Sequence, residues 1–272
     1  MKQTLKPSSV RLGRIAFTNN KIEDRIVLRK VLLHLANLDT ALDIMSKTLL
    51  EEEYSEYVSY MENAIRGNIS GLPAPEDAEY LIKDSLRSKV DAFIEGILCV
   101  LKYIKRNDPS AEEEQDLLFY TIMEVFEDSI LGLHSPYMIQ FVVYALVVRD
   151  EARAAGFLSF LCSNVHSADQ RRELMAVYIS SFIARAPGLS KDALSVAREY
   201  VEAAKDRVSR IDDRFSQVLL SGLAHIEETS CHDLGLADFL AQAKTGRASI
   251  KYPFDPTPIE DYNQIIKEYS RA

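Results

Sequence analysis

The sequence predicts an all-helical protein, built either as a bundle or as an α-solenoid of antiparallel helix pairs. Apolar residues recur at spacings of three and four along most of the chain, which is the period of an amphipathic helix. No stretch alternates with a period of two for long enough to predict a strand. Only 10 of 272 residues are glycine, which argues against an all-β sandwich and against a glycine-rich nucleotide-binding fold.

The clearest helix is predicted over residues 77–106, where apolar side chains lie near one face and polar residues fill the other. Pro73 and Pro75 end the segment before it, and Asp77 is its candidate N-cap. The other predicted helices cover residues 22–35, 39–66, 112–131, 136–148, 150–165, 168–186, 190–208, 212–229, 233–243 and 259–270. Residues 141–148 are uninterruptedly apolar and would also suit a buried strand, but their helical neighbours favour a buried helix.

The rhythm of these helices suggests stacked pairs. Between residues 136 and 229 they run 13–19 residues each, separated by short breaks such as Asp150, Ser167 and Pro187-Gly188. The spacing of a pair is close to the roughly 40–47 residues of known helix-pair repeats. The rhythm comes without any internal sequence repeat.

Three parts are expected along the chain. Residues 1–21 form a basic N-terminal arm, and residues 22–245 form the helical-repeat domain. Residues 246–272 form an extended proline-rich segment followed by a C-terminal helix, both docked on the repeats. Three prolines within residues 252–258 keep that segment extended, and its aromatic residues Tyr252 and Phe254 are expected to dock it on the helical body.

Cysteine usage and hydropathy predict a soluble protein that is not secreted. Cys99, Cys162 and Cys231 are too few and too widely spaced for a disulfide framework or a zinc ribbon, so we expect reduced, buried thiols in an intracellular protein. Residues 1–20 lack the apolar core of a signal peptide, and the longest apolar run, eight residues, is far short of the roughly 20 that span a bilayer. We therefore expect no membrane partner.

The charge is distributed unevenly. The chain carries a net −9, yet residues 1–35 hold eight basic residues against two acidic ones, which leaves −15 on the remainder. An acidic body repels phosphate backbones, so little direct DNA binding is expected. The basic arm could contact an acidic partner or nucleic acid, although such arms are more often simply solvated.

No pattern for catalysis or metal binding stands out. The common nucleotide, hydrolase and zinc motifs are absent, and we expect no cofactor, no metal and no small-molecule ligand. Cys231 and His232 are adjacent in sequence, and because adjacent side chains on a helix or turn point apart, no pre-formed dyad is expected. Asp212-Asp213 would suit a prenyl-diphosphate synthase only with an aspartate at the position of Ser216, so the pair is interpreted as a helix start.

Two sequence blocks resemble the RNA polymerase I-specific transcription initiation factor family. Residues 178–186 read Tyr-Ile-Ser-Ser-Phe-Ile-Ala-Arg-Ala, similar to a helix end typical of that family, with Ser180 where the family usually has glycine. Residues 252–256 read Tyr-Pro-Phe-Asp-Pro, similar to the family's C-terminal element. Residues 136–144 and 215–220 resemble two further family helices. Because family members are about twice as long, the chain resembles a shortened member.

The resemblance implies a HEAT-like α-solenoid without enzymatic activity. Such a factor binds RNA polymerase I and bridges it to a promoter-bound core factor for ribosomal RNA synthesis, in the nucleus and specifically in the nucleolus. The family's polymerase-docking surface includes a serine-rich patch, for which Ser85 and Ser88 are the candidates here.

Further residues of the two blocks take roles under the same resemblance. Tyr178 and Phe182 are expected in the solenoid core, and Tyr252, Phe254 and Asp255 in the C-terminal element. Arg185, at a predicted helix C-terminus, is a candidate partner contact, but capping that end or pairing with a neighbouring carboxylate is favoured.

Two alternatives remain at this stage. One is an unrelated α-solenoid adaptor or scaffold, which would have the same fold without polymerase binding. The other is an all-α enzyme, which would require a deep pocket with converging carboxylates or histidines near Asp212 and His232.

Overall fold

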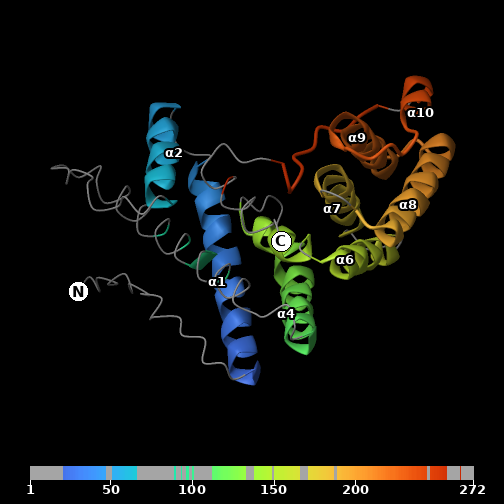
Figure 1. Cartoon of the computed structure of the whole chain (residues 1–272). Coiled ribbons are helices and arrows are strands. Elements are labelled where there is room, and N and C mark those ends of the chain that lie inside the picture. The colour runs from blue at the N-terminus through green and yellow to red at the C-terminus, as the bar shows by residue number, and fades with distance from the viewer. Residues whose placement is uncertain are drawn as a thin grey trace, which may run out of the picture.

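The computed structural model of the chain confirms the all-α class (Figure 1). Helices account for all of its regular structure in the part described, and no strand occurs there. The described residues are 21–46, 51–65, 89, 93, 96, 97, 100, 112–132, 138–148, 150–165, 171–186, 189–243, 246–255 and 264. Asp77, Ser85 and Ser88 therefore lie outside the described part. Only a few residues of the helices predicted over 77–106 and 259–270 lie within it. Within it, no helix combines the length and the apolar character needed to cross a bilayer.

The first two helices divide at a different place from the one predicted. α1 (Lys21–Ser46) continues through the expected break at residues 36–38, and α2 (Glu51–Ile65) follows it. The predicted break was wrong: residues 36–38 and the following Asp39 all lie inside α1. The buried carboxylate of Asp39 accepts hydrogen bonds from the backbone of Met138 (2.9 and 3.0 Å) and Ile139 (2.9 Å), at the start of another helix.

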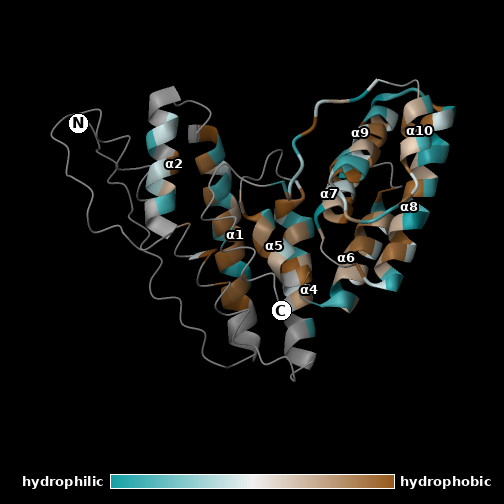
Figure 2. Ribbon diagram, turned by 45° about the horizontal axis from the view of Figure 1, so that its top comes forward, coloured by the Kyte–Doolittle hydropathy of each residue, from teal (hydrophilic) through white to brown (hydrophobic). Residues whose placement is uncertain are grey.

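α1 lies alongside α4 (Glu112–Val125), which continues directly into a π-helical turn, η2 (Phe126–Ile130) (Figure 1). Arg29 of α1 pairs with Asp128 at 3.2 Å across this contact. α5 (Gln140–Val147) follows, so the apolar run that could have been a strand is a helix, as predicted. Figure 2 shows hydrophobic residues along α5 and hydrophilic ones along the outer side of α8.

The C-terminal half contains α6 (Glu151–Asn164), α7 (Arg171–Arg185), α8 (Lys191–Arg210) and α9 (Arg214–Thr229). Three of these begin at side-chain caps close to the predicted starts: Asp150 accepts from the Arg153 amide, Ser190 from the Ala193 amide and Asp213 from the Ser216 amide. In space, α6 packs against α7, and α8 against α9; across the pairs, α6 packs on α8 and α7 on α9. The four helices are thus two stacked pairs.

α10 (Ala237–Gln242) is shorter than the predicted helix over 233–243. The reason lies in the residues before it. Asp233 Oδ1 accepts the Gly235 amide at 3.0 Å, and Gly235 has a φ of 64°. These residues form a turn, and the left-handed backbone at Gly235 prevents the helix from starting earlier.

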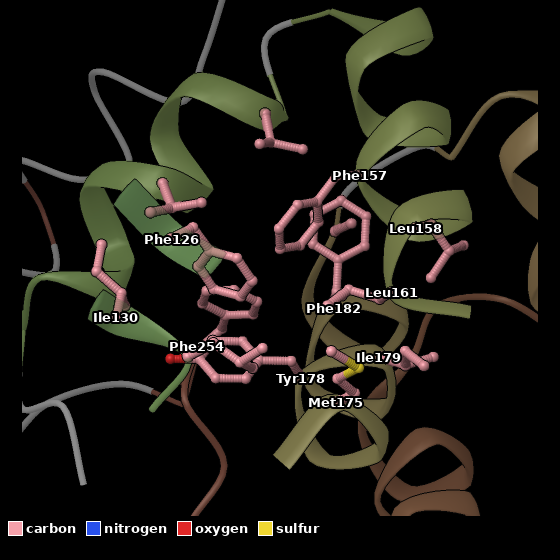
Figure 3. Packing of buried hydrophobic residues seen from close by; sticks show 14 of the residues in the cluster. Phe126, Ile130, Phe157, Leu158, Leu161, Met175, Tyr178, Ile179, Phe182 and Phe254 are labelled. Atoms are coloured by element: carbon pink, nitrogen blue, oxygen red, sulfur yellow. The ribbon is translucent and has the colours of Figure 1, made fainter. Parts of the chain in front are cut away.

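An aromatic cluster joins the two halves (Figure 3). Phe126 of η2 makes edge contacts with Phe157 of α6 (5.3 Å between centroids) and Tyr178 of α7 (5.0 Å). Phe182 of α7 closes the set against Phe157 at 5.1 Å. Phe254, from the C-terminal segment, adds a further edge contact with Tyr178 at 5.6 Å. The core is therefore completed by a residue far along the chain.

Candidate functional site

The most elaborate polar arrangement in the described part surrounds the C-terminal segment, which we define as residues 246–255. It runs without helical structure past α9, α5 and α7. The helical residues that hold it, called here the docking site, are Gln140, Tyr144, Tyr178, Ser181, Phe182, Arg185, Ser221 and His225.

Helix side chains satisfy the backbone of the C-terminal segment. Ser221 Oγ accepts the Ala248 amide at 2.7 Å and donates to the Ala248 carbonyl at 3.0 Å. Gln140 Nε2 donates to the carbonyl of Pro253 at 2.8 Å. Ser181 Oγ accepts the Phe254 amide at 2.9 Å. Main-chain contacts of this kind fix which residue of the segment stands opposite which helix.

Phe254 anchors the segment. The residue is 3% exposed, and its ring lies against Tyr144 (5.0 Å between centroids), Tyr178 (5.6 Å) and Phe182 (6.2 Å). Figure 3 shows this ring beside Tyr178, facing the cluster. Burying a phenylalanine side chain stabilises a fold by about 2 kcal/mol, so this one residue supplies a large part of the binding energy of the segment.

Asp255 provides the charged contact. Arg185 donates to Asp255 Oδ1 from both Nε (2.9 Å) and Nη2 (2.7 Å), and His225 Nε2 lies 3.3 Å from the same oxygen. Burial alone would raise the pKa of Asp255. The neighbouring His225 and Arg185 outweigh burial, so the pKa lies below the ordinary value of 3.8 and the group is ionised at neutral pH.

Tyr252 stacks flat on His225, with 3.7 Å between the ring centroids and 4° between the planes. Burial raises the pKa of the Tyr252 hydroxyl, and the charges of Asp255 and Glu228 raise it further, so the phenol stays neutral. His225 therefore contacts two residues of the segment at once, stacking on the ring of Tyr252 and lying 3.3 Å from the carboxylate of Asp255.

The docking site brings together the two blocks singled out in the sequence. Ser181, Phe182 and Arg185 come from residues 178–186, and Phe254 and Asp255 from residues 252–256. Arg185, offered from sequence as a partner contact or a structural residue, is engaged by Asp255. Ser221 and His225 of α9 had no sequence signal, because only the packing of α9 on α7 places them beside the segment.

Ser180 stands where the family usually has glycine, and it packs against Gly222 of α9. A Cβ atom added to Gly222 of α9 would lie 2.2 Å from Ser180 Oγ, so α7 and α9 cross too closely for any larger residue at 222. Ser180 is buried and donates to the Ala176 carbonyl at 2.8 Å. Gly222 of α9 is thus the small residue that lets α7 and α9 cross closely here.

Asp212-Asp213 is a helix start, as interpreted from sequence. Asp213 accepts hydrogen bonds from the Ser216 amide (2.7 Å) and hydroxyl (2.8 Å) and pairs with Arg207 at 2.6 Å. These contacts, the Ser216 amide foremost, lower the pKa of Asp213. Asp212 is exposed and borders a surface hollow that contains no histidine among its lining residues.

The expectation for Cys231 and His232 was wrong in two respects. Cys231 Sγ lies 3.7 Å from His232 Nε2 in the bend after α9, so the two adjacent side chains do not point apart as expected. Cys231 is also exposed rather than buried, and Cys162 is partly exposed; both are free thiols. Asp233 does not complete a triad, since its carboxylate accepts the Gly235 amide. Searched over the described residues, no group of His, Cys, Asp and Glu side chains is placed to hold a metal ion.

Fold and site together define an all-helical protein of stacked helix pairs whose main polar site holds a peptide segment. The chain belongs to the family of the RNA polymerase I specific transcription initiation factor RRN3, whose sequence profile matches residues 23–226, three quarters of the chain. This confirms the resemblance carried by residues 178–186. Comparison with curated proteins and with solved structures gives no match.

Proposed function

We propose that this protein is an RNA polymerase I-specific transcription initiation factor. It binds RNA polymerase I, bridges it to the promoter-bound core factor and so recruits it for ribosomal RNA synthesis, without catalysing a reaction itself. The observation that carries the proposal is the family match over residues 23–226. The corresponding place of action is the nucleus, and within it the nucleolus.

The packing of the helices is consistent with this role. We interpret the stacked pairs α6–α7 and α8–α9 as part of a HEAT-like solenoid within residues 22–245, preceded by the basic arm over 1–21 and followed by the segment over 246–272. Solenoids bury their helix interiors and present long outer faces to large partners. The net charge of −9 suits docking on a protein better than direct binding to DNA.

The polymerase-docking surface is assigned to the N-terminal half, with Ser85 and Ser88 as candidate contacts. Arg185 is less suited to that role while the C-terminal segment is docked, because Asp255 occupies its guanidinium group.

Size-exclusion chromatography tests the proposal. The purified protein is mixed with purified RNA polymerase I and, separately, with RNA polymerase II at moderate salt. Co-migration with polymerase I alone is the expected result, and the double substitution of Ser85 and Ser88 by glutamate should weaken it. Ser195→Glu, on the exposed side of α8, is the matched control. Absence of co-migration in every phosphorylation state would contradict the proposal and favour an unrelated solenoid adaptor.

A further inference from the structure

We propose that the docking site is a peptide-recognition site for extended aromatic-Pro-Phe-Asp sequences, and that a partner protein carrying such a sequence displaces residues 252–255 from it. In this structure the chain's own C-terminal segment occupies the site. The inference goes beyond the proposed function and can be tested without any polymerase.

The backbone of the segment is held by side chains of the helices. Extended chain inside a folded domain usually pairs with another strand, whereas here helix side chains meet its amide and carbonyl groups. Gln140 holds the Pro253 carbonyl, and Ser181 holds the Phe254 amide. These contacts meet the backbone of an extended peptide, and none of them requires a covalent link to α10.

The docking site is selective for the side chains of the segment. Three neighbouring residues of the segment meet three different chemistries. His225 offers a flat face to the ring of Tyr252, the aromatic cluster encloses Phe254, and Arg185 with His225 faces the carboxylate of Asp255. The cationic end of the site sets the direction of the peptide, since only an acidic residue after the phenylalanine meets Arg185.

Apart from Phe254, the segment and α10 are held by contacts near the surface. From Ala237 to Asp255, leaving aside residues 244 and 245, Phe254 is the single buried side chain. α10 has no buried residue and packs chiefly on α9. Release of Phe254, together with the partly exposed contacts of Tyr252 and Asp255, would free the segment while the helices stay packed on one another, as expected for a locally reversible contact.

Fluorescence anisotropy with a labelled peptide tests this inference. The probe has the sequence of residues 248–257, and the binding proteins are the full chain with and without Phe254→Ala, which empties the site of its own anchor. The variant should bind the peptide saturably. The unsubstituted chain should bind at least about tenfold more weakly, because its own segment competes at high effective concentration.

Paired controls test whether binding occurs at the docking site. Adding Arg185→Ala to the variant should weaken binding by about tenfold or more, as should replacing aspartate by asparagine in the peptide. Adding Arg198→Ala, on the exposed side of α8, should change nothing. If circular dichroism shows that Phe254→Ala does not fold, Tyr252→Ala, which removes only the stacked ring, takes its place.

Two results would overturn the inference. One is a lack of binding at the docking site. It would appear as no saturable peptide binding by a folded variant at millimolar peptide, or as binding that Arg185→Ala leaves unchanged. The other is concentration-dependent dimerisation of the unsubstituted chain that Phe254→Ala abolishes, which would make the occupant a second copy of this chain rather than a different protein.

Discussion

Arg185, the last residue of α7, holds Asp255 through two hydrogen bonds to a single carboxylate oxygen, although the two residues are 70 positions apart. The contact joins the block at residues 178–186, which lies within the family match, to the block at residues 252–256, which lies beyond it. Arg185 thus stabilises the C-terminal segment from the helix that also supplies Tyr178 and Phe182 to the core.

Arg185→Ala should destabilise the protein by about 1 kcal/mol. The pair is about one third exposed on each side, so solvent screening limits its contribution, while the two-bond geometry keeps it above that of a fully exposed pair. Urea unfolding followed by circular dichroism measures the change. Arg198→Ala, also an arginine in a helix of this half but exposed, should have little effect. Equal effects of the two substitutions would contradict a specific role for the Asp255 contact.

Acid should weaken the docking of the C-terminal segment. The pKa of Asp255 in the folded protein lies below the ordinary 3.8, so its stabilising contribution is complete above that value and is lost as the pH falls through the lower folded value. Asp255→Asn should therefore be less stable than the unsubstituted chain at pH 7, with the difference closing below about pH 4. Urea unfolding at pH 7, 5, 4 and 3 measures this, and a difference that stays constant with pH would contradict it.

Asp39→Ala should be more damaging than any surface substitution in α1. The carboxylate of Asp39 is buried and accepts the amides of Met138 and Ile139, which begin α5, so its removal leaves buried donors unsatisfied. A loss of about 2–3 kcal/mol in the free energy of unfolding is expected. Asp116→Ala, an exposed aspartate of α4, is the control. A similar small loss for both would show that Asp39 does not cap α5.

Gly222→Ala should destabilise the protein even though alanine favours helices. The added methyl group would lie 2.2 Å from Ser180 Oγ and 2.9 Å from Ser180 Cβ, so α7 and α9 would have to separate. The expected cost is about 1–3 kcal/mol. Adding Ser180→Gly, the residue usual in the family, should recover most of the loss in a double-mutant cycle. Additive effects of the two substitutions would contradict a direct contact.

Local signals account for what the sequence predicted well. Asp150, Ser190 and the Asp212-Asp213 pair marked the starts of α6, α8 and α9, because capping acts within three residues along the chain. Contacts far along the chain give no such signal: the side chain of Asp39 accepts amides at the start of α5, about 100 residues away, and the break predicted at residues 36–38 lies inside α1. α10 begins later than predicted because the chain turns at Gly235, and helical periodicity does not reveal such a turn.

Parts of the docking site and of the segment that it holds could be found from sequence. Arg185, Phe254 and Asp255 lay in the two family-like blocks, yet nothing in their spacing indicated that the blocks touch. Ser221 and His225 reach the segment only because α9 packs on α7, and Gln140 only because α5 lies beside them. Such contacts depend on tertiary packing, which a single sequence does not record.

The central claim is selective recognition of RNA polymerase I, and its most direct test is a pair of dissociation constants. The full chain is immobilised, and its binding to purified RNA polymerases I and II is measured under identical salt conditions. The account predicts that polymerase I binds at least about a hundredfold more tightly, a difference of about 3 kcal/mol. Equal affinity for the two polymerases, or no binding to polymerase I, would contradict it.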